Sequence, residues 1–457
     1  MKAIVLGSDI EAVVAARELA KGGMDVVLVG ENNVPSPSGG GSGWGWGSSD
    51  VWASAILPDA TRLDFTADIA RTAEAIGRIS ARDAERWPRF CERLHALAVV
   101  LEDIYSKPPP DPLTHQTGGL VDLLRTGLRL RKLGAAGTNE LLRLLPMSAA
   151  DLLDAWFEND AVKGVLGAVA VRHLAQGPRS GGTAFNLLHH HVGCAPGVFG
   201  RPPRERYDVP EAPNRIEANA MRIEVADGRA RGVVLDDGRT LDADVVVSAL
   251  DPKRTLLGLV DAACLDPELV RALRNIRSRG VAARLTFTLN APPDFETLVI
   301  APSLDYIERA HDDSKYGRVS AAPVIEATHD GEHRVHAHVQ YVPYALREGT
   351  WDGARFEALA DAAIAKIDAA SRGFADRVVE SRVLTPAHLE AQYGWPQGQA
   401  YHAEIALDQV LWMRPLPQLA RYRTPIGSLY LCGVAMHPGG VLPGAAGAHA
   451  ASTVLKD

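Results

Sequence analysis

The sequence predicts an α/β fold: a mostly parallel, nucleotide-type domain assembled from both ends of the chain, with an inserted α+β domain. Three observations predict it. Strand, helix and strand patterns follow one another over residues 2–29, and a continuous β-branched run recurs at Asp244–Ala249. The chain then ends with a further strand, a glycine-dense turn and an Ala-rich helix. A length of 457 residues also favours two domains over one small core.

The first unit begins with Lys2–Leu6, a short apolar run that ends in Gly7. An Ala-rich helical pattern follows over about Ile10–Lys21, and Met24–Val29 has the continuous apolar character of a buried parallel strand. Together they predict a βαβ unit. Residues 34–50 are almost entirely Pro, Ser, Gly and Trp, so we expect a loop there.

Helical patterns dominate two stretches of the middle of the chain, 66–134 and 138–175. A proline-rich break interrupts the first of them at Lys107–Pro112. Helices inserted between the strands of a nucleotide-type domain commonly cover a ligand cavity, so we expect a mainly helical cap. A basic run, Arg125–Lys132, is interpreted as the solvated face of a helix or, alternatively, as a patch that contacts a membrane surface.

From Arg215 onwards the pattern changes to strand alternation, and two Asp-Gly turns, at 227–228 and 237–238, predict hairpins. Later strands are predicted at 281–289, 334–342 and 428–432, and helices at 350–370 and 385–391. We therefore predict that the nucleotide-type domain is formed by three parts of the chain: 1–65, 181–255 and the C-terminal part 426–457. The mainly helical cap and substrate part is predicted at 66–180, and the substrate domain at 256–425.

Composition excludes several classes of protein. A net charge of -8 leaves no basic excess to neutralise phosphates, so we expect no nucleic-acid partner. The four cysteines are scattered without metal-ligand spacing, which is typical of a reducing cytoplasm rather than of a disulfide framework. No signal-peptide pattern and no apolar run long enough to span a bilayer is present. We expect a cytoplasmic protein without a transmembrane segment.

The first βα turn, Gly7–Ala12, is the first candidate binding element. A dinucleotide-binding turn has glycine at its first, third and sixth positions, which are occupied here by Gly7, Asp9 and Ala12. Asp9 opposes a diphosphate through its charge and bulk, and it is also a favourable N-cap for the helix that follows. The acid that would bind a ribose is displaced by one place, since Gly30 ends the second strand and Glu31 follows it.

Histidines supply the candidate for proton transfer. His437 lies in the C-terminal glycine turn and is our candidate catalytic residue. The run His189–His191 lacks metal-ligand spacing, because adjacent side chains point in different directions, so we predict no metal site. His336 and His338 alternate on one strand face, where they either meet a ligand or are half exposed to solvent.

The C-terminal segment Leu429–Ala451 resembles the flavin-capping segment of phytoene-desaturase-like oxidoreductases, in the branch of the pyridine nucleotide-disulfide oxidoreductase domain-containing proteins and within the amine-oxidase-type flavoprotein superfamily. Further stretches share the resemblance: 181–190, 244–252, 384–390, 401–409, 413–417 and 421–425. It implies a Rossmann-like FAD/NAD(P)-binding-type domain, FAD as cofactor and a lipophilic substrate. The FAD-binding residues that it implies are Gly7, Ala12, Glu31, Gly433, Gly439, Gly440 and Gly444.

The chain also departs from that family, and all the departures lie on the cofactor side. The loop at 34–50 replaces a paired-glycine segment, with Gly39–Gly41 at a different spacing, and 200–213 replaces a glycine-rich turn and helix. Val441 interrupts the glycine run, and Ala448-His449 replaces a usual polar pair. This pattern indicates a degenerate cofactor site on a retained scaffold.

Three functions remain open at this point. The first is an FAD-dependent oxidoreductase acting on a lipophilic small molecule, as the resemblance implies. The second is a flavin-free relative, either non-catalytic or isomerase-like, because hydride chemistry needs an electron sink that no side chain supplies. The third is a partner subunit of a homologous flavoprotein, or a carrier of an apolar ligand. A homo-oligomer and peripheral membrane contact are also compatible with the sequence.

Overall fold

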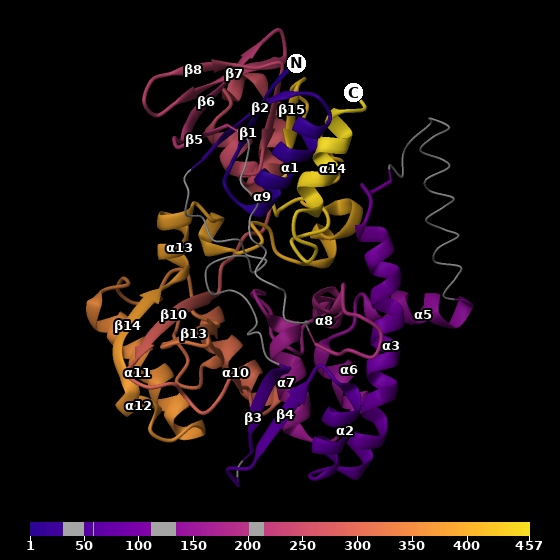
Figure 1. The fold of residues 1–457 in the computed structure, drawn as a ribbon, viewed down its shortest axis with the longest axis vertical. Helices are drawn as coiled ribbons and strands as arrows, with labels where there is room; N and C mark the ends of the chain where they lie inside the picture. Colours follow the sequence, from indigo (N-terminus) through magenta and orange to yellow (C-terminus); the bar gives the residue numbers. More distant parts are fainter. Residues whose placement is uncertain (31–49, 58, 111–133, 201–213) are drawn as a thin grey trace.

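The computed structural model describes residues 1–30, 50–57, 59–110, 134–200 and 214–457. Figure 1 shows an upper part that holds both chain ends and a lower part formed by the middle of the chain. The upper part is built on a parallel sheet, and the lower part on a mixed sheet flanked by helices. The predicted α/β class, with a parallel sheet that uses N- and C-terminal strands and a mixed substrate sheet, is confirmed.

The upper sheet has five strands in the order β15-β9-β1-β2-β5, and each neighbouring pair is parallel. Its inner strands are buried because both faces are covered, which explains their continuous apolar sequences. The predicted βαβ unit, the strand at Asp244–Ala249 and the C-terminal strand and helix are confirmed. The elements are β1 Lys2–Leu6, α1 Ile10–Lys21, β2 Asp25–Val29, β5 Arg215–Ile216, β9 Val245–Ser248, β15 Leu429–Leu431 and α14 Ala445–Val454.

The two helices from opposite chain ends, α1 and α14, pack against each other in the upper part (Figure 1). Gly447 permits this close approach, since a Cβ at Gly447 would lie 2.2 Å from the backbone oxygen of Glu11. Beside the parallel sheet, a small antiparallel sheet forms from the predicted hairpins, with Gly228 and Gly238 at positive φ in the turns. Its strands are β6 Ala220–Ala226, β7 Arg229–Leu235 and β8 Thr240–Asp242.

The lower part is centred on a seven-stranded sheet in the order β14-β10-β13-β12-β11-β3-β4. The strands predicted at 281–289 and 334–342 are confirmed, and helix α11 (Gly353–Ala370) contacts the sheet through β14 and β11. No strand was predicted over 51–66, where β3 and β4 form and join this sheet by pairing β3 with β11. The strands are β3 Val51–Ile56, β4 Arg62–Thr66, β10 Ala282–Leu289, β11 Thr297–Ile300, β12 Val324–His329, β13 Arg334–Gln340 and β14 Val378–Leu384.

Helices from the first half of the chain form the remaining core, in which Trp87, Phe90, Phe157 and Phe199 pack ring against ring. The predicted helical character of 66–110 and 138–171 is confirmed, whereas 34–49, 125–132 and 201–213 lie outside the described residues. These helices are α2 Ile69–Gly77, α3 Ala81–Tyr105, α5 Gly134–Leu144, α6 Ala149–Trp156, α7 Asp160–Val171 and α8 Thr183–His191. The later ones are α9 Pro267–Asn275, α10 Leu304–Lys315, α12 Phe374–Arg377 and α13 Pro386–Tyr393.

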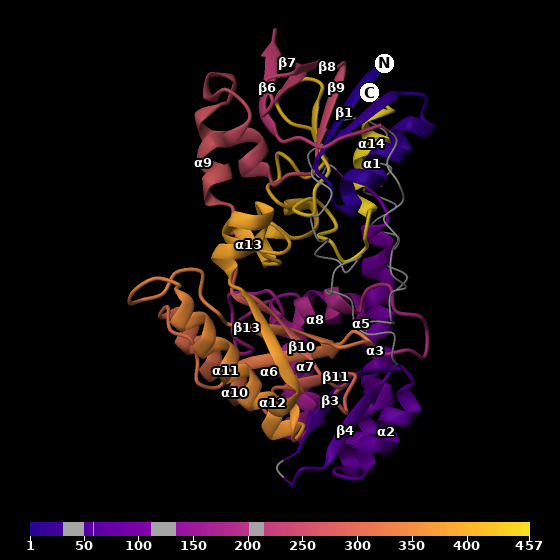
Figure 2. The ribbon, with the colours of Figure 1, turned by 60° about the vertical axis from the view of Figure 1, so that its left-hand side comes forward.

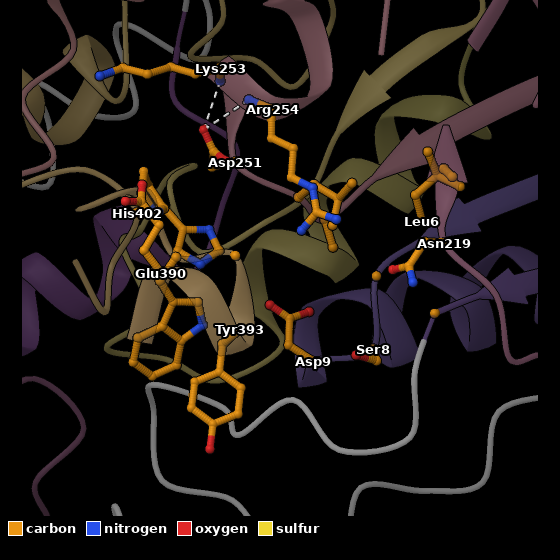
Figure 3. Close-up of a pocket in the computed structure, with 18 of the residues that line it drawn as sticks. Leu6, Ser8, Asp9, Asn219, Asp251, Lys253, Arg254, Glu390, Tyr393 and His402 are labelled. Carbon is orange, nitrogen blue, oxygen red and sulfur yellow. Dashed lines mark hydrogen bonds between the residues drawn. The ribbon is translucent and has the colours of Figure 1, made fainter. Parts of the chain in front are cut away.

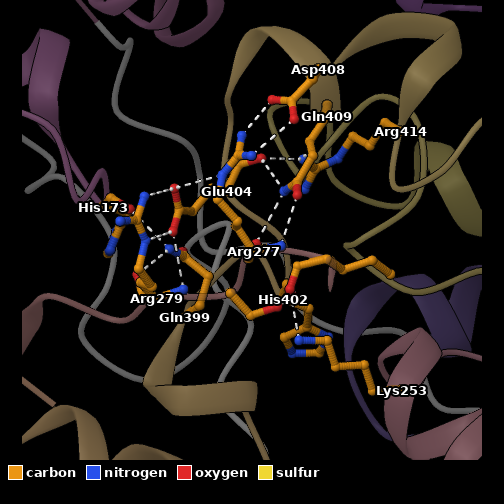
Figure 4. Close-up of polar contacts among 12 residues, drawn as sticks. His173, Lys253, Arg277, Arg279, Gln399, His402, Glu404, Asp408, Gln409 and Arg414 are labelled. Atoms are coloured by element: carbon orange, nitrogen blue, oxygen red, sulfur yellow. Dashed lines mark hydrogen bonds and ion pairs between the residues drawn. The ribbon is translucent and has the colours of Figure 1, made fainter. Parts of the chain in front are cut away.

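The two parts are joined where the chain passes from α9 to β10, and α13 lies between them in Figure 2. An ion pair fixes this crossing: the buried Glu404, 1% exposed, accepts from the half-exposed Arg279 through Nε at 2.7 Å and Nη2 at 3.0 Å (Figure 4). Arg277 binds the neighbouring Asp408. Among the described residues no helix is long and apolar enough to cross a membrane. All four cysteines are free.

Candidate functional site

A cavity of about 670 Å³ lies at the carboxyl edge of the five-stranded sheet, between that sheet and α13 (Figure 3). Open α/β sheets bind ligands at this edge, because the strand ends and the helix N-termini meet there. The lining comes from six segments that are distant in the sequence: 6–9, 29–30, 218–220, 249–254, 390–396 and His402. This cavity is therefore the first place to look for a ligand.

The β1–α1 turn forms one wall, and its glycines are required by close packing. Gly7 has φ of +124°, and a Cβ there would lie 2.9 Å from Ala249 Cβ. A Cβ at Gly30 would lie 2.6 Å from the Gly7 carbonyl oxygen. Ala12, the third predicted residue of this turn, is completely buried in α1. Glu31 lies outside the described residues.

Asp9 is the N-cap of α1, as the sequence predicts. Its carboxylate accepts a hydrogen bond from the backbone N–H of Ala12 at 3.0 Å, which satisfies one of the free donors of the first helical turn. The residue is 8% exposed, and burial raises the pKa of Asp9 from 3.8 to about 6. The start of α1 is thus occupied by a carboxylate of this chain.

A second carboxylate, that of Glu11, occupies the start of α14. It accepts from Gly444 N at 3.0 Å and from Gly447 N at 2.9 Å, and the residue is 2% exposed. Burial, with a smaller contribution from the charge of Asp9, raises the pKa of Glu11 from 4.5 to about 8. Glu11 was not among the residues predicted from the sequence. The signal that the sequence offers is an acidic residue in the first turn of a predicted helix.

The glycines of the C-terminal turn are packed against other atoms of this chain. Gly439, Gly440 and Gly444 have φ of +88°, +79° and +79°, where side chains are disfavoured. A Cβ on these residues would contact Arg414, Val434 or Val14 within 2.8 Å. A Cβ at the fourth predicted residue, Gly433, would lie 2.1 Å from the carbonyl oxygen of residue 249.

Arg414 holds this turn in place from inside the protein. It is 1% exposed, and its guanidinium donates only to backbone carbonyls, with no carboxylate partner in the described part of the chain. Burial lowers the pKa of Arg414 to about 10, which leaves it charged at neutral pH. The acceptors are the carbonyl oxygens of Tyr401, Ala403, Glu404, Gln409, Val434 and Met436.

His437, the candidate proton-transfer residue, is completely buried and does not line the cavity. Its ring meets the ring of Tyr105 at 5.3 Å, and its Nε2 lies 3.4 Å from the carbonyl oxygen of Ile104. Burial, followed by the neighbouring His449, lowers the pKa of His437 to about 3, so the imidazole is neutral at neutral pH. Its catalytic role stays a prediction.

The other candidate histidines lie in the lower part, where His189–His191 are buried and His336 and His338 are partly exposed. His189–His191 end α8, and Tyr105 Oη lies 2.8 Å from His189 Nδ1. His338 Nε2 lies 3.1 Å from Gln340 Oε1 on the same strand, β13. Within the described ranges, the group with metal-ligand spacing is Glu308, His311 and Asp312 on α10, away from every predicted site residue.

Comparisons with known proteins place these features in context. No protein-family model matches the chain. It is 29% identical to the rat (Rattus norvegicus) pyridine nucleotide-disulfide oxidoreductase domain-containing protein 2 over 438 residues, which cover 85% of this chain and 75% of the rat protein. It is 27% identical to the lycopene-forming phytoene desaturase of Paracoccus sp., over 51% of this chain and 48% of that protein. A shorter match, 33% over 121 residues, covers 25% of this chain and 21% of a limonene dehydrogenase subunit from Castellaniella defragrans.

Solved structures share the fold over the whole chain. An oxidoreductase from Methanosarcina mazei superposes with a TM-score of 0.57 at 12% identity, covering 100% of both chains. Putrescine oxidase bound to putrescine superposes with a TM-score of 0.58 at 13% identity, also covering 100% of both. The chain therefore has the fold of putrescine oxidase and of the Methanosarcina oxidoreductase, and in sequence it is similar to the pyridine nucleotide-disulfide oxidoreductase domain-containing protein 2 and to phytoene desaturase.

Proposed function

We propose that this chain is a phytoene-desaturase-like oxidoreductase scaffold for a lipophilic molecule, in which the residues at the flavin positions do not fit tightly bound FAD. One observation carries the proposal: the starts of both α1 and α14 are occupied by carboxylates of the chain, those of Asp9 and Glu11. FAD-dependent relatives and the shared fold support the oxidoreductase ancestry.

A competing charge opposes tight FAD binding at the start of α1, and occupied N–H groups oppose it at the start of α14. A dinucleotide places its anionic diphosphate at a helix N-terminus, where free backbone N–H groups and the helix dipole attract negative charge. At α1 that position holds the buried carboxylate of Asp9, whose charge and volume both compete with a phosphate. At α14, Glu11 already accepts the N–H groups of Gly444 and Gly447. Two of the predicted binding residues, Ala12 and Gly444, therefore donate their backbone N–H groups to carboxylates of the chain.

Without a bound flavin the chain has no electron sink for hydride transfer. Two roles then follow for the scaffold: acid–base chemistry of the isomerase type, or binding without catalysis. His437 is the proposed proton-transfer residue for the first role, and its ring lies against the ring of Tyr105. Gly7, Ala12, Glu31, Gly433, Gly439, Gly440 and Gly444 remain the residues expected to contact FAD if it does bind.

A second candidate is a partner subunit of a homologous flavoprotein. The match to the Castellaniella protein supports it, since that protein is by name one part of a multi-subunit limonene dehydrogenase. In this arrangement the homologue supplies the flavin, and this chain supplies the scaffold or holds the apolar ligand. Co-expression with a flavin-bearing homologue, followed by affinity purification and measurement of flavin absorbance, tests it: a stable complex of defined stoichiometry supports this role, and elution of this chain alone contradicts it.

The visible spectrum of the freshly purified protein, followed by an FAD titration, tests the main proposal. We expect a colourless protein and weak FAD uptake. Asp9→Gly should raise FAD affinity measurably, and adding Glu11→Asn should raise it further, because each change removes a competing carboxylate. Asp266→Gly is the matched control, since Asp266 caps α9 in the same way but lies outside the cavity.

The outcomes separate cleanly. Stoichiometric flavin in the wild-type protein would overturn the proposal and return the chain to FAD-dependent catalysis. Unchanged FAD affinity in both the Asp9→Gly and the double variant would show that the two carboxylates are not the cause. A gain in the Asp9 variants that is absent from the Asp266→Gly control would support the electrostatic explanation.

A further inference from the structure

We propose that the cavity at the carboxyl edge of the five-stranded sheet binds a small organic carboxylate with an apolar body, and that Arg254 and His402 hold its carboxylate group. The inference rests on the proposed function, because FAD, if bound, would occupy this same edge. Arg254 and His402 come from segments that are 148 positions apart, yet both line the cavity. Figure 3 shows their side chains around the same space.

Arg254 supplies the positive charge. Its backbone N–H binds Asp251 Oδ1 at 3.1 Å, but its guanidinium has no hydrogen-bond or ion-pair partner among residues 1–30, 50–57, 59–110, 134–200 and 214–457. A glycine makes room for it: a Cβ at Gly394 would lie 2.3 Å from Arg254 Nη1. A half-buried guanidinium that lacks a protein partner is well suited to a carboxylate, since its planar fork donates two parallel hydrogen bonds.

His402 supplies a neutral donor and acceptor beside that charge. The residue is 8% exposed, and both of its ring nitrogens are buried without a hydrogen-bond partner in the described part of the chain. Its backbone is fixed by Ser278, whose hydroxyl donates to the His402 carbonyl oxygen at 2.8 Å. Burial, and then the charges of Arg414 and Arg254, lower the pKa of His402 to about 3. Two buried ring nitrogens without a partner, on a residue that lines the cavity, indicate a missing ligand partner.

The remaining charged groups around the cavity favour one negative charge on the ligand over several. Asp251 is engaged by the backbone N–H groups of residues 253 and 254, and Lys253 Nζ donates to the Ile276 carbonyl oxygen at 2.7 Å. Glu390 accepts from Gln397 N. Asp9 faces the space and repels a highly charged diphosphate more strongly than it repels a single carboxylate.

The rest of the lining suits an apolar body. Leu6 and Ala249 lie on the sheet side, and Tyr393, Trp395 and Pro396 lie on the side of α13. A volume of about 670 Å³ is within the range of cavities that enclose drug-sized molecules. The partly exposed ring of Tyr393 favours an aryl group by stacking. An aryl carboxylate therefore matches both halves of the cavity.

Isothermal titration of the flavin-free full-length protein with cinnamate tests the inference, with the uncharged cinnamamide as the matched ligand. We expect saturable binding of one cinnamate per chain and markedly weaker binding of cinnamamide. Arg254→Met should weaken cinnamate binding by about tenfold or more, the range expected for a lost charge-assisted hydrogen bond. Gly394→Ala should act in the same direction, because the new Cβ displaces the guanidinium. Arg78→Met, an exposed arginine at the end of α2, is the control.

Equal affinity for cinnamate in the wild-type and Arg254→Met proteins, or no saturable binding up to millimolar concentrations, would overturn the inference. Thermal melts of each variant establish that it is folded. If Arg254→Met is not folded, Arg254→Lys replaces it. The lysine keeps the charge but loses the planar guanidinium that donates two parallel hydrogen bonds, so binding should again weaken. Flavin content of the purified protein is measured separately. A flavin-loaded protein would refute the proposed function, whereas a flavin-free protein that ignores cinnamate would refute only this inference.

Discussion

Replacing Arg414 by methionine should destabilise the protein strongly, although the residue is far from any surface. Arg414 donates to six backbone carbonyls that belong to two segments, 401–409 and 434–436, and so joins the crossover region to the C-terminal turn. Methionine fills a similar volume and removes all of these donors. The change therefore tests the hydrogen bonds with little effect on packing.

The expected loss in the free energy of unfolding depends on how many of the six carbonyl oxygens keep another hydrogen-bond donor in the variant. The Tyr401, Glu404 and Met436 oxygens also accept from Ala403 N, Gln409 Nε2 and Gly439 N respectively. The oxygens of Ala403, Gln409 and Val434 have no other donor in the described part of the chain. Each buried carbonyl left unsatisfied costs about 1–3 kcal/mol, and removing a buried cation returns part of that cost. We expect a net loss of about 3 kcal/mol or more.

Urea unfolding at neutral pH, followed by tryptophan fluorescence, measures this loss from the shift in midpoint and slope. Arg414→Lys keeps the charge with fewer donors, so its loss should be smaller than that of Arg414→Met. Arg254→Met is the matched control: the same substitution at an arginine whose guanidinium has no partner in the described residues should cost well under about 1 kcal/mol. An Arg414→Met protein as stable as the Arg254→Met protein would refute the reasoning.

Three further predictions concern stability. The folded-state pKa of Glu11, raised from 4.5 to about 8 by burial, means that the folded protein binds this proton more tightly than the unfolded chain. The free energy of unfolding should therefore fall as pH rises from about 4.5 to about 8, and urea midpoints across that window should fall less steeply in Glu11→Gln. Gly7→Ala, at φ of +124° with a Cβ 2.9 Å from that of Ala249, should cost about 1–3 kcal/mol in thermal or urea unfolding; a neutral result would contradict the tight turn. Glu404→Gln should cost about 1–2 kcal/mol, because the half-exposed Arg279 loses its charged bidentate partner, and a weaker dependence of stability on salt in the variant would support this cause.

The elements that the sequence predicted are those with a strong local signal. Lys2–Leu6 is a short apolar run, Val245–Val247 is a run of β-branched residues, and Gly228 and Gly238 mark tight turns between alternating strands. Asp9 was identifiable as an N-cap because the cap is a contact between near neighbours in the chain. In each of these cases the physics that forms the element acts over a few residues.

The features that the sequence did not predict depend on partners distant in the chain. Strand β3 joins its sheet by pairing with β11, more than two hundred residues away. Glu11 accepts from Gly444, which is 433 positions later in the sequence. In the sequence Arg414 has the character of a surface charge, because its six backbone acceptors are not visible from its neighbours in the chain. The cavity is assembled from six separate segments, so Arg254 and His402 could not be brought together by spacing.

The two buried carboxylates also bear on how the scaffold stays folded without a cofactor. A helix N-terminus buried beside another helix needs an acceptor for its free N–H groups, and an empty anion site would leave them unsatisfied. Under the proposed function, Asp9 and Glu11 supply these acceptors from within the chain, at α1 and α14 respectively. Their burial raises both pKa values, so the arrangement costs electrostatic energy at neutral pH and above. Because the chain supplies its own acceptors, its folding does not depend on a bound flavin. Under the proposed function this independence is necessary, since the protein keeps the cavity but lacks the cofactor.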